Sequence, residues 1–303
     1  MFKNILKSFS LKQTTGFLLL LIFLLANALI LWKYVLNEEK ASLSVSDRIV
    51  FIGGNPRSGT TLMRVLLDVH GSIYCGPETV ILLPFMALSK KLNEQLPPNV
   101  LMVRTRITAK SLKEATANFI LHVLKNRNKQ EDKILCAKDP PILNYMDILV
   151  DLFPNSKFIF MVRDGRAVSF SWLGYRKLEY NFQNYLDLLK EWDDRNNITM
   201  TLCDRVGPSY CKMVKYENLV LNKELVLRDL MKFLELEWND NMLNHENFME
   251  TDVELGRKEW SNSQVIKPIY YKDSSKKWAK EIEDYDENIV REEIPMLKFF
   301  GYV

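Results

Sequence analysis

The sequence has little histidine, few cysteines and almost no net charge. Its 303 residues include three histidines and four cysteines, and 41 basic residues against 38 acidic ones leave a net charge of +3. A chain this close to neutrality does not indicate a nucleic-acid partner, so any anion site must come from local placement of basic side chains. The scarce histidine and the lack of a C-x-x-C pair argue against a metal site.

The chain also lacks repeats, low-complexity tracts and any Pro/Gly-rich boundary between domains. Short apolar runs predict buried strands at 48–53, 134–137, 157–162 and 212–215. Apolar residues at helical spacing predict helices at 60–69, 112–124, 182–203, 223–234 and 285–299, the last broken at Pro295. Because strands alternate with helices, we expect one α/β domain with a mostly parallel sheet covered on both faces.

An uncharged segment near the N-terminus, residues 13–32, predicts a membrane anchor. A helix of that length extends about 30 Å, the thickness of a hydrocarbon core. Lys3, Lys7 and Lys12 precede it, so the positive-inside rule places the N-terminus in the cytosol. We predict a cytosolic tail at 1–12, a transmembrane signal-anchor at 13–35, a stem at 36–47 and a lumenal domain at 48–303. The alternative, a cleaved signal peptide, also exports the chain, although its apolar region would exceed the usual length of about 7–15 residues.

Two further features fit an exported compartment. The four cysteines, Cys75, Cys136, Cys203 and Cys211, can pair in three ways as far as the sequence alone decides. Asn197-Ile198-Thr199 is a glycosylation sequon, which matters only where the segment is lumenal and exposed. Neither feature identifies an activity.

Residues 54–61, which read G-N-P-R-S-G-T-T, predict an anion-binding loop between the first strand and a helix. The spacing matches the phosphate-binding loop G-x-x-x-x-G-K-[ST], except that Thr60 occupies the lysine position. Backbone N–H groups around Ser58, Gly59, Thr60 and Thr61 would face the anion, and Arg57 adds a charge. The missing lysine disfavours a nucleotide kinase, since that lysine reaches the β/γ-phosphates. The competing interpretation is an ordinary turn that caps a helix.

These residues resemble a known family. P-R-S-G-T-T followed by L-M-R-x-x-L-D-x-H is similar to the 5′-phosphosulfate loop of sulfotransferases, above all the protein-tyrosine sulfotransferases. The similarity continues through C-G-P-E-T at 75–79, K-D-P at 138–140, F-I-F-M-V-R-D-G-R-A at 158–167 and Q-V-I-K-P at 264–268. It implies a P-loop-like sulfotransferase fold, 3′-phosphoadenylyl sulfate (PAPS) as co-substrate, no metal, and a Golgi type II membrane protein that forms homodimers and acts on acidic tyrosine-containing proteins.

The resemblance also implies roles for individual residues. Glu78 matches the catalytic base that takes the phenolic proton, whereas by itself it would be read as solvated surface. Arg57, Lys138 and Ser261 match the groups that stabilise the transferred sulfonate. The 3′-phosphate contacts match Arg163 and Ser171, with Arg176 one place beyond the expected arginine position, which Tyr175 occupies. The residues expected around the nucleotide are Tyr216, Gln264, Val265, Ile266, Lys267, Pro268 and Lys277, with Lys276 as the alternative to Lys277. The implied disulfides are Cys75–Cys136 and Cys203–Cys211.

The sequence departs from the family on the acceptor side. Pro77 replaces a glutamate, and Val80 and Pro84 replace two arginines that are expected to engage acidic residues beside the target tyrosine. Other basic residues either supply compensating charge or form an ordinary solvated basic face, namely Lys90, Lys91, Arg104, Arg106 and Lys110. A sulfotransferase for a glycan or small-molecule hydroxyl therefore remains an alternative. A non-catalytic lumenal binding protein is a third hypothesis, against which the retained Arg57, Glu78, Lys138 and Ser261 argue.

Overall fold

The computed structural model describes residues 22, 24–27, 48–95, 107–128, 132–256, 265–267 and 277–303, without the side chains of positions 93, 95 and 277. The chain divides into two units, Met1–Ser44 and Val45–Val303. Within the described residues no helix is both long and apolar enough to cross a bilayer. The predicted anchor at 13–35 lies outside them, apart from residues 22 and 24–27, which are helical. The predicted tail and stem lie wholly outside them.

The second unit is built on a parallel sheet, as the sequence predicts. Its described strands run in the order β2-β3-β1-β4-β5. All neighbouring pairs are parallel, and the register places Ile52 beside Lys138 and Gly54 beside Met161. The strand bounds are β1 Ile49–Gly54, β2 Ile73–Tyr74, β3 Ile134–Lys138, β4 Lys157–Val162 and β5 Cys211–Lys215. The sequence missed only β2, which at two residues is too short for a periodic signal.

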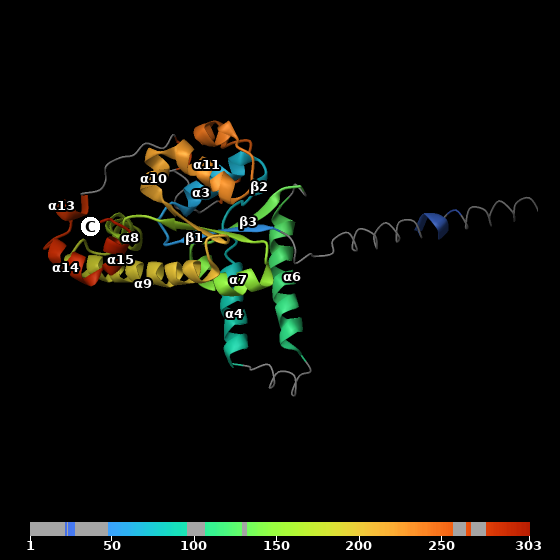
Figure 1. The fold of residues 1–303 in the computed structure, drawn as a ribbon, viewed down its shortest axis with the longest axis horizontal. Coiled ribbons are helices and arrows are strands. Elements are labelled where there is room, and N and C mark those ends of the chain that lie inside the picture. Colours follow the sequence, from blue (N-terminus) through green and yellow to red (C-terminus); the bar gives the residue numbers. More distant parts are fainter. Residues whose placement is uncertain are drawn as a thin grey trace, which may run out of the picture. The chain divides into compact units, whose positions relative to one another are not determined.

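Helices cover both faces of this sheet (Figure 1). One face carries α3 (Thr60–His70), α10 (Tyr216–Leu221) and α11 (Lys223–Phe233), and the other carries α7 (Met146–Leu152) and α9 (Phe182–Val206). The pleat of β1 explains the two cores, because successive side chains point to opposite faces. Val50 and Ile52 join the apolar cluster of α3 and α11, whereas Phe51 stacks on Phe158 with ring centroids 5.5 Å apart.

Several shorter elements flank these layers. The bounds are η1 Pro140–Tyr145, α8 Gly165–Arg176, η2 Asp240–Phe248, α13 Lys277–Glu281, α14 Glu287–Glu293 and α15 Pro295–Phe299. The predicted helix at 285–299 is therefore two helices, α14 and α15, and the expected break at Pro295 is confirmed. Phe300, just after α15, packs its ring against Phe160 and Trp192, which fixes the C-terminus on the α9 side.

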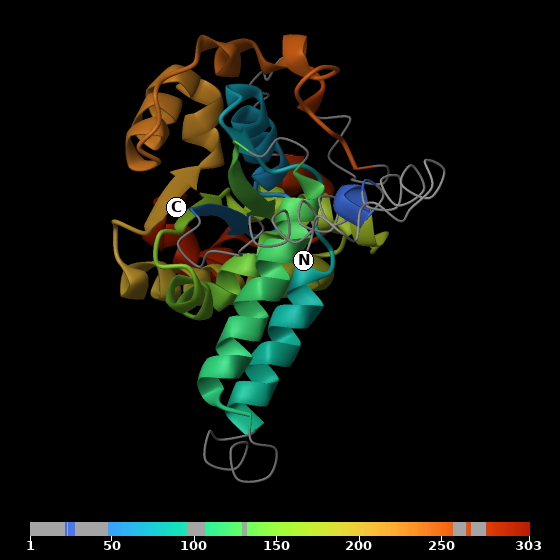
Figure 2. The same cartoon turned by 90° about the vertical axis from the view of Figure 1, so that its right-hand side faces the viewer.

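Two helices form an arm that projects from the sheet, as Figures 1 and 2 show. They are α4 (Leu82–Gln95), which the sequence did not predict, and α6 (Ala109–Arg127), predicted at 112–124. A capping box between Thr108 and Ser111 begins α6. Phe85 of α4 stacks on Phe119 of α6 with ring centroids 3.8 Å apart. Because the chain leaves the sheet along α4 and returns along α6, the end of α4 and the start of α6 lie at the free end of the arm.

Candidate active site

The predicted anion loop leaves β1 at Gly54 and enters α3 at Thr60. Gly54 (φ 140°) and Gly59 (φ 97°) have left-handed backbone conformations that favour glycine. A Cβ on Gly54 would lie 2.2 Å from the carbonyl oxygen of Met161, and one on Gly59 would lie 2.5 Å from the Tyr216 ring. The two glycines therefore allow the loop to pack directly against β4 and Tyr216.

Two other predicted donor residues contact Arg57 of this loop. They are Ser171 of α8 and Arg163, which follows β4. Arg57 Nε donates a hydrogen bond to Ser171 Oγ at 3.0 Å, and Arg163 Nη1 donates to the carbonyl oxygen of Arg57 at 3.2 Å. The Arg163 guanidinium also lies 4.3 Å from the centre of the Tyr216 ring. Four of the residues predicted around the donor, namely Arg57, Arg163, Ser171 and Tyr216, thus lie together although they are far apart in the chain.

Two arginine side chains, those of Arg57 and Arg163, lie half-buried and close together in this site. Arg57 has a positive φ of 76°, a strained conformation for an arginine. Burial lowers the pKa of Arg57, the neighbouring Arg163 lowers it further, and Tyr175 opposes the shift. Two adjacent half-buried guanidinium groups repel each other, and an anion between them would relieve that repulsion. The N-terminus of α3 contributes a positive dipole end at the same place.

Lys138 and Glu78 form the second half of the site. Lys138 ends β3 and is fully buried, and its Nζ lies 2.6 Å from Glu78 Oε1 and 3.3 Å from Thr61 Oγ1. The Glu78 side chain is 36% exposed, so it faces solvent while Lys138 does not. Lys138 therefore connects the anion loop, through Thr61, to the carboxylate predicted to act as the base.

A buried carboxylate fixes each side of the Glu78 loop. Asp68 Oδ1 accepts hydrogen bonds from the backbone N–H of Cys75 (2.7 Å) and Gly76 (3.3 Å), and Asp68 is itself paired with buried Arg64 at 3.1 Å. On the other side Asp139 accepts from the Thr79 hydroxyl and, at 3.3 Å, from the N–H of Val80. Burial raises the pKa of Asp139, and these two hydrogen bonds oppose the shift.

A disulfide and the side chain of Arg127 also hold the Glu78 loop in place. The structure contains both implied disulfides, Cys75–Cys136 and Cys203–Cys211. The first joins the start of the Glu78 loop to β3, two residues before Lys138. Arg127, at the end of α6, donates to the carbonyl oxygen of Pro77. Consecutive residues from Cys75 to Val80 are thus held from several directions, which fixes the direction in which Glu78 points.

Arg176 is placed differently from the other predicted donor residues. It makes a two-pronged ion pair with Glu191 of α9, at 3.1 and 2.9 Å, and stacks on Trp172 at 4.7 Å. The pair with Glu191 raises the pKa of Arg176. Tyr175, at the position where the resemblance predicts an arginine, instead lies near enough to Arg57 to oppose the lowering of its pKa by burial. The predicted contact of Arg176 with the 3′-phosphate would require this ion pair with Glu191 to break.

The segment predicted to surround the nucleotide is described only in part. Val265 is buried in the cluster of α3, whereas Ile266 and Lys267 are exposed. The carbonyl oxygen of Val265 lies 3.0 Å from Nε2 of buried His245, a contact that the sequence did not predict. Ser261, Gln264, Pro268 and Lys276 lie outside the described residues, and Lys277 begins α13 without a described side chain.

Sequence reasoning missed Asp68, Asp139, Arg127 and His245 as parts of the site. One signal was present: Arg64 and Asp68 are opposite charges four residues apart on a helix whose other faces are apolar. Asp139 follows the predicted Lys138 directly, but nothing local shows that its partners are sixty residues away. The contact of His245 with Val265 likewise carries no local signal.

All these groups gather at one edge of the sheet. Arg57, Arg163 and Tyr216 follow the carboxyl ends of β1, β4 and β5, and Lys138 is the last residue of β3. From β1 the chain passes to one side for β2 and β3 and to the other for β4 and β5, and ligands of open α/β sheets bind at such a switch. Together with the anion loop and the paired carboxylate, this arrangement defines a class: an α/β enzyme that transfers an anionic group.

The comparisons with known proteins give the family. The model of the sulfotransferase family matches residues 49–240, more than half of the chain. Protein-tyrosine sulfotransferase 2 of Gallus gallus is 37% identical over 271 residues, covering 88% of this chain and 72% of the relative. Protein-tyrosine sulfotransferase 1 of Homo sapiens is 36% identical over 259 residues, covering 84% and 69%. The chain belongs to the protein-tyrosine sulfotransferase family, a family of transferases, as its motifs predict.

Other similarities agree with this placement. The Drosophila melanogaster protein-tyrosine sulfotransferase is 34% identical over 277 residues, and the chain spans only 55% of its length. Among solved structures, the sulfotransferase domain of the Synechococcus olefin synthase is 25% identical with a TM-score of 0.58, covering 85% of this chain and 95% of that domain. A mouse sulfotransferase complexed with PAP shares the fold at a TM-score of 0.50 and 12% identity, covering 86% and 89%.

Proposed function

We propose that the chain transfers a sulfonate group from PAPS to tyrosine residues of proteins in the secretory pathway, giving O-sulfotyrosine and adenosine 3′,5′-bisphosphate. The contact that carries this proposal is the pair of Lys138 Nζ and Glu78 Oε1, 2.6 Å apart beside the anion loop. A cation for the sulfonate and a carboxylate for the acceptor proton are thus adjacent. The names of the relatives support the tyrosine acceptor.

The residues present fit PAPS. Its anionic groups would meet the N-terminus of α3, Arg57 and Arg163 on one side and Lys138 on the other. The lack of a lysine at Thr60 suits a donor without a triphosphate. The sulfotransferase family match and the PAP complex of the mouse protein support the same donor.

The chain's own residues perform two tasks in the transfer. Arg57 and Lys138 stabilise the negative charge that spreads over the sulfonate oxygens and the oxygen bridging to phosphate. Glu78 accepts the phenolic proton, because a tyrosine phenol has a pKa near 10 and is not ionised at neutral pH. The phenol oxygen bonds to sulfur as the bond from sulfur to the 5′-phosphate oxygen breaks, and adenosine 3′,5′-bisphosphate leaves. Tight fixing of the Glu78 loop keeps the base in position.

We infer a lumenal Golgi location with a single type II anchor at 13–35. The uncharged segment and the lysines before it support this orientation. The disulfides Cys75–Cys136 and Cys203–Cys211 support an oxidising compartment. The sequon residue Asn197 begins a partly exposed stretch of α9, since Ile198 is 51% exposed. A homodimer remains an expectation from the family.

Incubation of the full-length protein in detergent with labelled PAPS tests the proposed function directly. The acceptor panel contains single-tyrosine peptides, phenylalanine versions of the same peptides, and glycans. Label on the tyrosine peptides alone is the expected result. A second candidate, transfer to a glycan or small-molecule hydroxyl, is favoured by Val80 and Pro84 in place of arginines. Label on glycans but not on tyrosine peptides would establish that candidate instead.

A further inference from the structure

An exposed apolar surface begins two residues after the catalytic base. Val80 is 72% exposed, Ile81 50% and Leu88 52%, and Pro84 between them is also exposed. Ile81 directly precedes α4, and Pro84 and Leu88 lie within it. Their spacing of three and four residues places them on one side of the helix. We call these four residues the acceptor face. Soluble proteins seldom leave a row of apolar side chains beside an active site without a binding partner.

The backbone of Val80 gives an independent reason to assign function here. Its φ is 59°, a left-handed conformation that a β-branched residue rarely adopts. The hydrogen bond from its N–H to Asp139 holds this conformation. Core packing does not explain it, because the side chain points into solvent. Strained residues that persist in a folded protein gather at active sites and ligand clamps.

Among the described residues, the predicted compensating cations lie elsewhere, and the other two, Arg104 and Arg106, fall outside the described part of the chain. Lys90 and Lys91 are on the distal half of α4, about 12–14 Å beyond its first residue at the helical rise per residue. Lys110 lies in the first turn of α6, at the free end of the arm, where it is 3.8 Å from Glu114. Arg127 is nearer to Glu78, but its guanidinium is bonded to the Pro77 carbonyl oxygen. Residues 80–88, which lead from the Glu78 loop into α4, are all apolar.

We propose that the acceptor face binds apolar side chains flanking the target tyrosine, so that the preferred substrates carry tyrosine in an apolar rather than an acidic segment. The inference rests on the proposed function. From Ile81 to Leu88 the helix advances about 10 Å. An extended peptide covers about 10 Å in three residues. A tyrosine whose phenol reaches Glu78 therefore places its nearest neighbours over this face.

Three matched peptides test the inference with the full-length protein and PAPS. Each carries one tyrosine, and the residues within three positions of it are leucine and isoleucine, serine, or aspartate and glutamate. We expect kcat/KM for the apolar peptide to exceed that for the serine peptide at least tenfold, with the acidic peptide no better than serine. A higher kcat/KM for the acidic peptide than for the apolar one would overturn the inference while leaving the proposed function intact. Failure of all three peptides would overturn the proposed function itself.

Charge substitution on the face provides the second arm of the experiment. Val80→Arg and Leu88→Arg are both at exposed positions, and we expect each to reduce the advantage of the apolar peptide at least fivefold. Val80→Arg should raise kcat/KM for the acidic peptide about tenfold. Leu225→Arg, on α11 and also 72% exposed, is the matched control and should change neither. If Val80→Arg instead altered only the oligomeric state, the face would serve self-association and the inference would be wrong.

Discussion

Lys138 and Glu78 are sixty positions apart in the chain, and their Nζ and Oε1 atoms lie 2.6 Å apart. Lys138 is fully buried and Glu78 is partly exposed. A charge-assisted hydrogen bond of this length is among the stronger contacts in a protein. The groups assigned to the donor sulfonate and to the acceptor proton are thus neighbours, and the proposed transfer would take place at this point.

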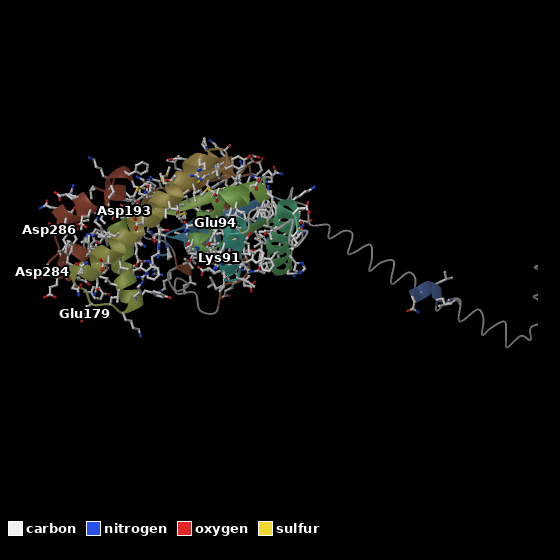
Figure 3. The ribbon with its side chains drawn as sticks, turned by 90° about the horizontal axis from the view of Figure 1, so that it is seen from below. Lys91, Glu94, Glu179, Asp193, Asp284 and Asp286 are labelled. Atoms are coloured by element: carbon white, nitrogen blue, oxygen red, sulfur yellow. A yellow bond between two sulfur atoms is a disulfide. The ribbon has the colours of Figure 1, made fainter. Side chains whose placement is uncertain are left out.

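The first prediction concerns the base. Glu78→Gln keeps an oxygen that can accept from Lys138 but removes the group that takes the phenolic proton. Turnover on a tyrosine peptide should fall by about 10²–10⁴, the usual contribution of a general base, with little change in binding of PAP or peptide. Steady-state kinetics and calorimetry measure these quantities. Glu94→Gln, at an exposed position of α4, is the control (Figure 3). Near-normal turnover of Glu78→Gln would refute the phenol mechanism.

The second prediction concerns Asp139, which positions the Glu78 loop without being assigned to either substrate. Asp139→Ala removes the acceptor for Thr79 and Val80, and hydrogen bonds to a charged group contribute about 1.5–3 kcal/mol. We expect kcat to fall tenfold or more, PAP affinity to stay within twofold, and Asp139→Asn to restore part of the loss. Asp151→Ala, at an exposed ion pair on α7, is the control. Equal losses in kcat and PAP affinity would point to general unfolding instead.

The third prediction concerns the nucleotide. The anion loop has Thr60 where a triphosphate-binding loop has lysine, and Arg57 and Arg163 surround it. Adenosine 3′,5′-bisphosphate should therefore bind at least tenfold more tightly than ATP by calorimetry. Tighter binding of ATP would refute the assignment of the donor.

The fourth prediction separates Arg163 from Arg176. Arg163 contacts the loop at the Arg57 carbonyl, whereas Arg176 is paired with Glu191 on α9. Arg163→Ala should weaken PAP binding at least tenfold and Arg176→Ala less than threefold. Calorimetric titration of both variants checks the difference. A larger effect of Arg176→Ala would mean that PAP draws Arg176 away from Glu191.

The fifth prediction concerns the disulfides. Peptide mapping without reduction should recover Cys75 joined to Cys136 and Cys203 joined to Cys211. In the chain-entropy model the first bridge, with a sequence separation of 61, stabilises the fold by about 4 kcal/mol, and the second, with a separation of 8, by about 2.5 kcal/mol. Replacing the first pair by serine should lower both Tm and kcat, since it also frees the Glu78 loop. Replacing the second pair should lower Tm alone. Free thiols at Cys75 and Cys136 would contradict the exported location.

The sheet and the donor loop could be predicted from the sequence because their signals are local. The buried strands are continuous apolar runs, and the loop at 54–61 has a fixed spacing of glycines. The arm was half missed, since α4 contains Pro84 and its first seven residues are all apolar, which hides the helical period. Its stability comes instead from contacts with α6, such as the stacking of Phe85 on Phe119.

The charged residues of the candidate site could be predicted from the sequence, but the hydrogen-bond partners that hold their loops in place could not. Arg57, Glu78, Lys138 and Arg163 stand in motifs, and the structure brings all four to the same edge of the sheet. The hydrogen bonds of Asp139 and His245 join segments far apart in the chain, and no local pattern encodes them. Such partners are fixed only when the tertiary structure forms.

The residues of the acceptor face and those of the donor site lie on different elements of the fold. Arg57, Arg163 and Tyr216 follow the sheet, whereas the acceptor face lies at the start of α4 on a separate helical projection. A substitution at Val80, Pro84 or Leu88 therefore leaves the contacts among Arg57, Ser171 and Arg163 in place. If the acceptor face selects substrates as proposed, single substitutions there change the preferred acceptor while the donor contacts persist, which is the condition under which new specificities evolve.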